Sequence, residues 1–362
     1  MKKIEVKTES KSYEVLIGQN VFSQFVQDFN KPDFKILVVC DKNVYRLHRT
    51  RIDDLLNSKE NFYFYSFNST ERNKNLKNTE LIYKHLFKNN FSRKDAIVAL
   101  GGGIVGDVAG FVAATYMRGI SFYQVPTTLL SMVDSSVGGK TGVNFIEIKN
   151  LIGAFYQPEK VYADLNFLET LSPKEIISGA GEIFKYAFLA DEENYLLIRN
   201  KLAKLLSEKK FDENLIARCI KLKAAVVEND EKELSGLRKV LNLGHTFAHA
   251  FESALKFQIK HGEAVIAGIF ASLIVSEKLD IISKSDFQKY VSDFLFLPVN
   301  KKILNSDTDS VIEFMKSDKK TSDRKIKLVL ASKPGNMLID VFVDERLVKK
   351  SLKELFEIFR TV

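Results

Sequence analysis

A chain of 362 residues exceeds the usual size of one domain, about 100 to 200 residues, so its length predicts two domains. Hydrophobic residues make up 45% and charged residues 28% of the chain, which is the composition of an ordinary globular protein and not of a disordered or membrane-embedded one. The formal charge of +8 allows an anionic ligand, but the basic residues are scattered and not interleaved with aromatic ones, so nucleic-acid binding is not indicated.

The chain begins with alternating polar and apolar residues from Met1 to Val6, a pattern typical of a strand and unlike a signal peptide. The longest apolar stretch, Ala264 to Val275, is too short to cross a bilayer and is predicted to be a buried helix. Cys40 and Cys219 have neither metal-binding spacing nor a disulfide framework, so we expect two reduced structural residues. These features predict a cytoplasmic protein.

Strand-like and helix-like segments alternate in the first half of the chain. Apolar runs at 35–40, 62–67 and 95–100 predict strands of a parallel α/β sheet. The pattern changes after Leu171, where Ser172 and Pro173 have the composition of a helix start. Helical periodicity then runs through 175–190, 194–208, 212–229, 244–256 and 262–279. We predict a Rossmann-like α/β domain at 1–171 and an all-helical domain at 172–362.

A glycine-rich loop follows the predicted strand at 95–100. Gly101, Gly103 and Gly106 have the spacing G-x-G-x-x-G, which lets the backbone approach a pyrophosphate at the start of a helix. Glycines at strand ends often serve only as turns, so the motif alone leaves both interpretations open. The usual ribose-binding acid downstream is not evident; Asp41 would take that role if its strand, Ile36 to Cys40, lies next to the one at 95–100.

Three of the five histidines, His245, His249 and His261, fall close together in the predicted helical domain. Imidazoles are preferred zinc ligands, and the four-residue spacing of His245 and His249 places both on one face of a helix. Taken alone, that spacing favours these two as a metal pair. His48 and His85 have no clustered partners and are interpreted as surface residues.

A catalytic zinc site needs a third protein ligand, for which Glu182 is the candidate. Lys185 follows one helical turn later, and a simple alternative is an exposed ion pair between the two side chains. Their apolar neighbours argue against that alternative.

Six segments together resemble the 3-dehydroquinate synthases, in that family's order and near its spacing. They are GGGIVGDVAGFVAATYMRG, QVPTTLLSMVDSSVGGKTGVN, KNLIGAFYQP, SGAGEIFKYA, LRKVLNLGHTFAHAFE and HGEAV. Ala248 stands where the family usually has glycine, and the stretch from Phe145 to Ile148 is also unusual. The resemblance implies conversion of 3-deoxy-D-arabino-heptulosonate 7-phosphate to 3-dehydroquinate and phosphate, a step of the shikimate pathway to chorismate and the aromatic amino acids. It implies transient oxidation by NAD, phosphate elimination, re-reduction and intramolecular aldol closure.

The same resemblance implies the ligands of each group. Zinc or cobalt would be held by Glu182, His245 and His261, which leaves His249 to the substrate. NAD would contact Asp41, Glu71, Lys74, Gly103, Ile104, Val105, Gly106, Asp107, Thr127, Thr128, Lys140, Lys149, Phe167, Leu168, Glu169 and Thr170. The catalytic, substrate-contacting set would be Arg118, Asp134, Lys140, Asn150, Lys185, Lys223, Arg238, Asn242, His249 and Lys319, the last standing for either lysine of the pair 319–320.

Two other activities remain as alternatives. Sister sugar phosphate cyclases depart from the family's pattern at the positions matching Lys185, Arg238, Asn242 and His249, all of which are kept here. A metal-dependent polyol dehydrogenase would instead release NADH. The resemblance further implies a homodimer acting on an anionic sugar-acid phosphate, with no nucleic-acid or membrane partner.

Overall fold

The computed structural model describes residues 1–29, 33–57, 60–146, 148–317 and 325–360. The chain forms two compact units. Unit 1 contains Met1–Leu171 and Ile216–Lys232, and unit 2 contains Ser172–Leu215 and Glu233–Val362. The chain first passes from unit 1 to unit 2 after Leu171, which is where the sequence pattern changes. The return of 216–232 to unit 1 departs from the prediction of two consecutive domains.

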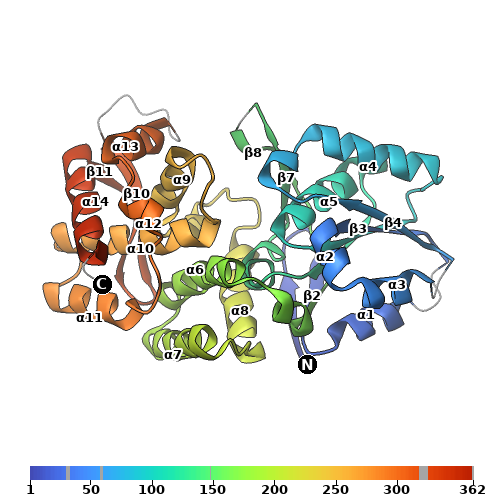
Figure 1. Ribbon diagram of the computed structural model, residues 1–362, viewed down its shortest axis with the longest axis horizontal. Helices are drawn as coiled ribbons and strands as arrows, with labels where there is room; N and C mark the ends of the chain where they lie inside the picture. The colour runs from blue at the N-terminus through green and yellow to red at the C-terminus, as the bar shows by residue number, and fades with distance from the viewer. Residues whose placement is uncertain (30–32, 58–59, 147, 318–324, 361–362) are drawn as a thin grey trace. The chain divides into compact units, whose positions relative to one another are not determined.

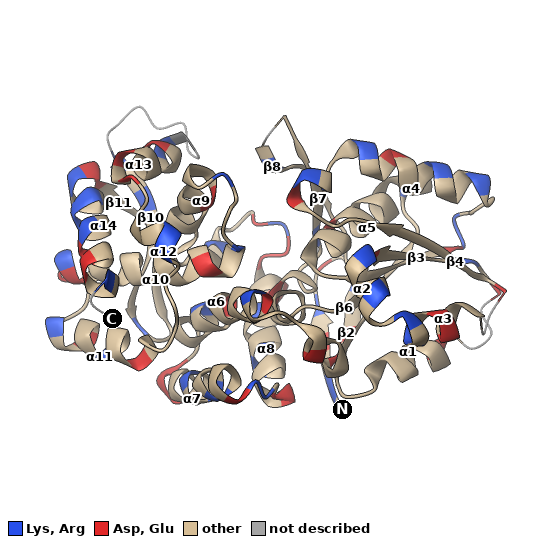
Figure 2. Cartoon of the chain, in the orientation of Figure 1, with Lys and Arg blue, Asp and Glu red and all other residues tan. Residues whose placement is uncertain are grey.

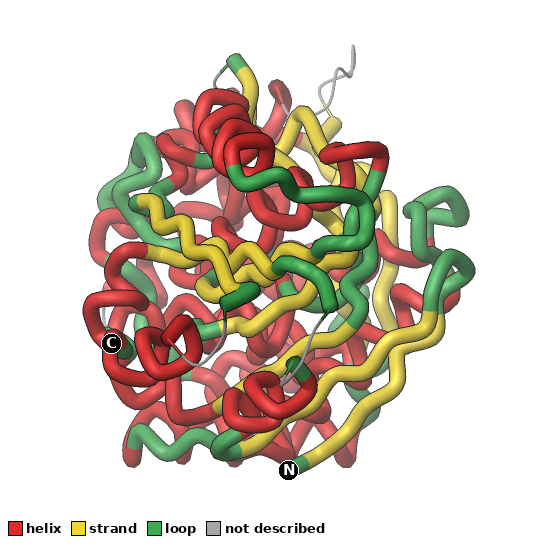
Figure 3. Tube along the Cα trace, turned by 90° about the vertical axis from the view of Figure 1, so that its right-hand side faces the viewer, coloured by secondary structure: helices red, strands yellow, loops and turns green. Residues whose placement is uncertain are grey.

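Unit 1 is built on a seven-stranded sheet with the order β1-β2-β9-β6-β5-β3-β4. Figure 1 labels β2, β3 and β4 of this sheet. β1 pairs antiparallel with β2, and the other neighbours pair in parallel. Figure 3 shows β1 leading directly from the N-terminus. The strands are β1 (Lys2–Lys7), β2 (Ser12–Gly18), β3 (Ile36–Asp41), β4 (Phe62–Phe67), β5 (Ala96–Gly101), β6 (Ser121–Pro126) and β9 (Lys160–Asp164). The predicted parallel α/β sheet is therefore confirmed.

Helices and one hairpin complete unit 1. The helices are α1 (Val21–Asp28), α2 (Lys42–Leu47), α3 (Arg49–Asn57), α4 (Leu76–Lys88), α5 (Gly103–Thr115) and most of α8 (Glu213–Asn229). Short helical turns are η1 (Glu71–Asn73), η2 (Tyr116–Arg118), η3 (Ser131–Ser135) and η4 (Leu165–Thr170), and the hairpin is β7 (Lys140–Phe145) with β8 (Ile148–Phe155).

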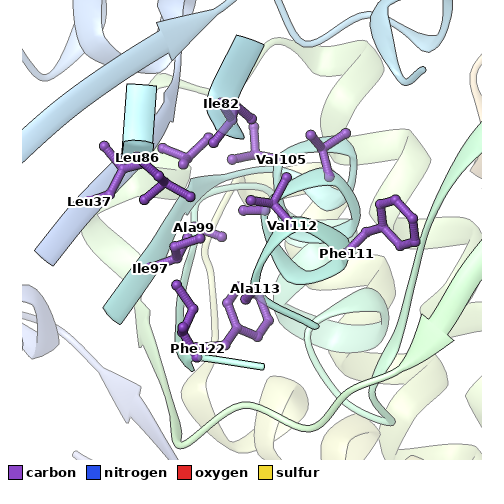
Figure 4. Packing of buried hydrophobic residues seen from close by; sticks show 14 of the residues in the cluster. Leu37, Ile82, Leu86, Ile97, Ala99, Val105, Phe111, Val112, Ala113 and Phe122 are labelled. Atoms are coloured by element: carbon purple, nitrogen blue, oxygen red, sulfur yellow. The ribbon is translucent and has the colours of Figure 1, made fainter. Parts of the chain in front are cut away.

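The core of unit 1 lies where α4 and α5 pack on the sheet. Leu37 of β3 and Ile97 of β5 meet Ile82 of α4 and Val105 and Val112 of α5, and all five are fully buried (Figure 4). Every residue of β3 and β5 is buried, as expected for central parallel strands covered on both faces. Burying one such side chain contributes about 1.5 to 3 kcal/mol, so this cluster holds the glycine loop after β5 on a rigid base.

Unit 2 contains α6 (Pro173–Leu189), α7 (Glu192–Glu208), η5 (Leu237–Asn242), α9 (His245–Ala254), α10 (His261–Lys278), α11 (Lys284–Phe294), α12 (Lys301–Leu304), α13 (Thr308–Ser317) and α14 (Glu345–Arg360). Ser172 caps α6 by accepting from the N–H of Glu175, as its sequence predicts. α10 is buried from Gly262 to Ser276. In the part of the chain that the structure describes, no helix has both the length and the apolarity to span a membrane.

The prediction of an all-helical second domain was wrong. β10 (Lys325–Lys333) and β11 (Asn336–Asp344) form an antiparallel hairpin in unit 2. The turn between them contains Gly335, whose φ of 80° lies in the left-handed region that glycine adopts without strain. Isoleucine, leucine and valine are enriched on both sides of this turn, which is typical of strands.

Basic and acidic residues are interspersed on the surface helices instead of forming one block of either sign (Figure 2). On α4, Lys84 pairs with Glu80 at 2.6 Å, and both side chains are exposed. Such pairs contribute little to stability, so they fit a solvated surface.

The segment after α8 is tied to the β1–β2 turn by one buried carboxylate. Glu231 accepts hydrogen bonds from the Ser10 N–H at 2.9 Å and from Gln157 Nε2 at 2.8 Å. Burial disfavours the charged form of Glu231, but these donors hold its pKa below the ordinary value for glutamate. Because the folded-state pKa is lowered, the stabilisation is complete above the ordinary pKa and is lost as the pH falls through the lowered one.

We expect Glu231→Ala to lower the free energy of unfolding by about 2 to 3 kcal/mol, because it leaves the buried Gln157 amide and the part-buried Ser10 N–H without their acceptor. Urea denaturation at pH 7 and at pH 4 measures the effect, and the deficit should shrink at the lower pH. Glu9→Ala, an exposed glutamate next to Ser10, is the control. An equal loss in both variants would argue against the role of Glu231.

Candidate functional site

Three side chains of unit 2 converge on one carboxylate oxygen. Oε1 of Glu182 lies 3.3 Å from Nε2 of His245 and 3.2 Å from Nε2 of His261. Glu182 belongs to α6, while His245 and His261 are the first residues of α9 and α10. The other ring nitrogen of His245, Nδ1, lies 3.1 Å from the carbonyl oxygen of Leu243. Donation from Nδ1 to that carbonyl leaves the lone pair of Nε2 directed at Glu182.

Two glycines allow this convergence. A Cβ on Gly262 would lie 1.8 Å from the carbonyl oxygen of Ser178, and a Cβ on Gly181 would lie 2.3 Å from the carbonyl oxygen of Gly262. The backbones of α6 and α10 therefore touch at a point where neither helix tolerates a side chain. Since Glu182 follows Gly181 and His261 precedes Gly262, this contact places the carboxylate beside the imidazole.

The charges at this point favour a bound cation. Glu182 is 1% exposed and pairs with Lys185, which is 2% exposed, so the two do not form a surface ion pair. Burial opposes the ionisation of Glu182, but Lys185 and His245 hold its pKa well below the ordinary value. Burial also disfavours charge on His261, yet Glu182 and Glu252 raise its pKa to about 10. Two imidazoles and one carboxylate, arranged around a point that attracts positive charge, fit a catalytic zinc site.

His249 was the partner that the four-residue spacing favoured. Its ring centre lies 5.7 Å from that of His245 and 6.2 Å from that of His261. His249 groups instead with Glu252 and His261, whose ligand-type atoms lie within 4.8 Å of one another. The set around Glu182 therefore takes His261 in place of His249.

Two further predicted residues of unit 2, Arg238 and Asn242, belong to η5. Arg238 is 2% exposed, and its Nε lies 3.5 Å from Oε1 of Glu233. Asn242 is the last residue of η5 and stands three positions before His245. Lys319 lies outside the described residues.

In unit 1, the glycine loop joins β5 to α5, which begins at Gly103 and includes Ile104, Val105, Gly106 and Asp107 in its first turns. The N–H groups at this helix start are suited to a phosphate. β3 pairs directly with β5, with Cys40 opposite Leu100. The strand that ends at Asp41 therefore lies next to the strand before the glycine loop, as the proposed ribose-binding role of Asp41 requires. Thr127 follows β6, and its hydroxyl is buried without a hydrogen-bond partner among the described atoms. An unsatisfied buried hydroxyl beside this loop fits a polar ligand such as a dinucleotide.

A buried lysine joins two further residues of the predicted nucleotide set. Lys74 is 4% exposed, and its ammonium contacts the carboxylate of Asp107 and the amide oxygen of Asn150. Burial raises the pKa of Asp107, and Lys74 opposes that rise. Asn150 lies in β8 but has a φ of 53°, a left-handed conformation that interrupts the regular strand geometry at the residue whose side chain contacts Lys74.

The other predicted nucleotide contacts surround this group at several positions in the fold. Asp41 caps α2 and accepts from the N–H groups of Asn43 and Val44, and Glu71 accepts from Asn144 Nδ2 at 2.8 Å. Thr128 lies at the start of the turn that holds η3, Lys149 is in β8, and Phe167, Leu168, Glu169 and Thr170 belong to η4.

His48 and His85, interpreted as surface residues, are both partly buried and pack against aromatic rings. Nε2 of His48 lies 2.9 Å from Oγ1 of Thr170, and its ring packs edge-on against Phe167 with centres 4.8 Å apart. His85 packs against Tyr65. His48 therefore contacts two predicted nucleotide residues more than a hundred positions away, and no local sequence pattern indicates this.

α8 brings a lysine of the substrate set into unit 1. Nζ of Lys223 lies 2.7 Å from the carbonyl oxygen and 3.0 Å from Oδ2 of Asp134. Lys140 is the first residue of β7 and is exposed. Arg118 is exposed at the end of η2, where its φ of 66° is left-handed.

Two family models and several known proteins match most of the chain. A family model described as the N-terminal part of 3-dehydroquinate synthase matches residues 64–178, and one described as the C-terminal part matches residues 179–321. The chain is 40% identical over 366 residues to the 3-dehydroquinate synthase of Pelagibacter ubique strain HTCC1062. That match covers 97% of this chain and 98% of the relative.

Solved structures share the fold at lower sequence identity. A 2-deoxy-scyllo-inosose synthase in complex with carbaglucose-6-phosphate, NAD+ and Co2+ matches with a TM-score of 0.88 and 24% identity, covering 98% of this chain and 99% of that one. The 2-epi-5-epi-valiolone synthase ValA of Streptomyces hygroscopicus subsp. jinggangensis 5008, with NAD+ and Zn2+ bound, matches with a TM-score of 0.86 and 23% identity, covering 97% and 99%.

Proposed function

The chain belongs to the 3-dehydroquinate synthase family and is accordingly an enzyme of the carbon–oxygen lyase class, and we propose that it converts 3-deoxy-D-arabino-heptulosonate 7-phosphate to 3-dehydroquinate and phosphate. The observation that carries this proposal is the convergence of His245 and His261 on Glu182, in a chain that also has a glycine loop at the start of α5. A metal centre and a nucleotide loop are the two sites that this reaction requires. NAD and a divalent metal are the cofactors, as in the solved relatives.

A zinc or cobalt ion at Glu182 supplies Lewis-acid activation of substrate hydroxyl groups, and NAD supplies reversible hydride transfer. The chain's own part is to bind these groups and to orient the substrate. Lys185, buried beside Glu182, is available to a substrate oxygen near the metal. Because its partner is a ligand of the metal, Lys185 is also held in one orientation.

The substrate carries a carboxylate and a phosphate, which cationic side chains bind through charge-assisted hydrogen bonds. Lys140, Lys185, Lys223 and Arg238 are the lysines and arginine proposed for this task, together with the exposed Arg118. Asp134 orients Lys223 through the 3.0 Å ion pair. Asn150, Asn242 and His249 complete the polar set. Fixing the substrate in a reactive pose supplies proximity, which is the main contribution expected from these residues.

For NAD, the first turn of α5 offers its N–H groups to the pyrophosphate, and the Thr127 hydroxyl offers an unused donor. Asp41, at the end of β3, would accept from a ribose hydroxyl. His48 supports this set by its contacts with Thr170 and Phe167.

We expect Lys74→Met to weaken NAD binding by about 10- to 100-fold, because it leaves the Asp107 carboxylate and the Asn150 amide without their shared cation. Isothermal titration of NAD into the protein measures the dissociation constant. Lys77→Met, an exposed lysine three positions along, is the control and should bind NAD as the unchanged protein does. Unaltered NAD binding in Lys74→Met would contradict the proposed role.

Product analysis tests the function directly. Equal amounts of phosphate and 3-dehydroquinate, formed with NAD and metal present and without net NADH, support the proposal. Turnover of only a neutral sugar phosphate would assign the chain to the sister cyclases, and NADH build-up on polyols would assign it to the dehydrogenases. The homodimer and the cytoplasmic location implied by the resemblance stay predictions, which light scattering and cell fractionation test.

A further inference from the structure

A second buried carboxylate lies on the far side of the His261 ring from Glu182. Oε2 of Glu252 is 3.6 Å from Nδ1 of His261, whereas Nε2 of the same ring points at Glu182. Glu252 is 4% exposed, so its carboxylate is removed from water. We propose that Glu252 is a positioning residue of the metal centre, which accepts the Nδ1 proton of His261 and thereby keeps Nε2 free to bind the metal. The inference rests on the metal site of the proposed function and adds a residue to it.

The two imidazoles of the centre have similar surroundings, with one oxygen facing Nδ1 and another facing Nε2 in each ring. In His245, Nδ1 faces the carbonyl oxygen of Leu243 at 3.1 Å and Nε2 faces Glu182. In His261, Nδ1 faces Glu252 and Nε2 faces Glu182. Each ring therefore has an oxygen facing Nδ1, at 3.1 Å in His245 and at 3.6 Å in His261, and an oxygen in this position favours the tautomer with its lone pair at Nε2. The acceptor is backbone for His245 and a side chain for His261, so only the second can be removed by substitution.

The position of Glu252 follows from α9. His245, His249 and Glu252 are separated by four and three residues, so they lie on one face of the helix. His245 at the start of this face reaches Glu182 directly, and Glu252 two turns later reaches the opposite edge of His261. The His261 ring thus lies between two buried carboxylates that come from different helices, α6 and α9.

A carboxylate at Nδ1 does more than orient the ring. Its negative charge makes the imidazole a stronger electron donor to a metal at Nε2, and partners of this kind typically change metal affinity by 10- to 100-fold. The effect is exerted at the ligand and not at the substrate. It is therefore measurable by metal binding without turnover.

The test is Co2+ binding to the full-length protein, followed by competition with a chelator and by the visible d–d absorption of the bound ion. We expect Glu252→Gln to weaken Co2+ binding by about 10-fold and Glu252→Leu by about 100-fold, with a shift of the absorption band in both. Glu263→Gln is the matched control. That glutamate is also buried, lies two residues from His261, and accepts from Lys260 N and Asn300 Nδ2 instead of from an imidazole.

Folded Glu252→Leu protein that binds Co2+ within about twofold of the unchanged protein, with the same spectrum, would overturn the proposal. If Glu252→Leu does not fold, the same result for Glu252→Gln decides against it. An equal loss of affinity in Glu263→Gln would also overturn it, since the effect would then be a general perturbation of α10. Glu182→Gln separates this outcome from a failure of the metal site: if the unchanged protein and Glu182→Gln bind Co2+ equally, the site itself is wrong.

Discussion

Glu182→Gln is expected to remove metal binding and catalysis together. Among the described residues, the Glu182 carboxylate is the anionic group on which both imidazoles converge, and an amide is a poor ligand for zinc or cobalt. We expect metal affinity to fall by at least about 100-fold and the rate of phosphate release by about 1,000-fold or more. The substitution also leaves the buried Lys185 without its anionic partner, so a lower melting temperature should accompany the loss.

Metal content after dialysis, measured by atomic emission, and phosphate release at saturating NAD are the readouts. Glu175→Gln is the matched control, because it makes the same chemical change on α6 two turns earlier, where the partly buried Glu175 pairs with the exposed Lys260 at 2.5 Å. That variant should keep its metal and its activity. Full metal content and activity in Glu182→Gln would contradict the ligand assignment.

Gly262→Ala is the second substitution with a large expected effect. Its Cβ would lie 1.8 Å from the carbonyl oxygen of Ser178, a backbone atom that cannot rotate away. α6 and α10 must then separate, which we expect to cost about 3 kcal/mol of unfolding free energy. Because Glu182 and His261 are adjacent to this contact, metal affinity should fall by more than about 10-fold even in the protein that remains folded.

Chemical denaturation and Co2+ titration measure the two effects. Gly106→Ala is the control for stability, because a Cβ on that helical glycine would meet only the amide end of Gln124, at 3.0 Å. Normal stability and normal metal affinity in Gly262→Ala would mean that the helices do not need this contact.

Local patterns predicted much of the fold because they depend on residues only a few positions apart. The apolar runs at 35–40, 62–67 and 95–100 became β3, β4 and β5 within one residue at each end. Ser172 caps the start of α6, as predicted. The periodic segment at 194–208 forms most of α7. A strand followed by glycines and a helix likewise indicated the nucleotide loop. The pairing of β3 with β5 then brings the strand that ends at Asp41 next to this loop, which the local pattern alone did not predict.

The candidate metal centre could not be predicted from local patterns, because its residues are far apart in the chain. Spacing alone favoured His249 as the partner of His245, and the family resemblance, not the spacing, implied His261. Glu182 and His261 are 79 positions apart, and they meet because Gly181 and Gly262 let two helices touch. No periodicity within either helix encodes that crossing. The same limit applies to the contact of His48 with Thr170 and to the buried hydroxyl of Thr127.

Local sequence patterns were enough to predict β3, β4 and β5, the glycine loop, the capped start of α6 and the residue types available for metal and phosphate, because helix and strand periodicity and capping act over a few residues. Packing between distant segments is what brings His261, and not His249, next to Glu182, places Glu252 beside the same ring, and returns 216–232 to unit 1 with Lys223. These features depend on packing between segments far apart in the chain. Packing is set by which surfaces fit when all the elements are buried together, and no single segment carries that information.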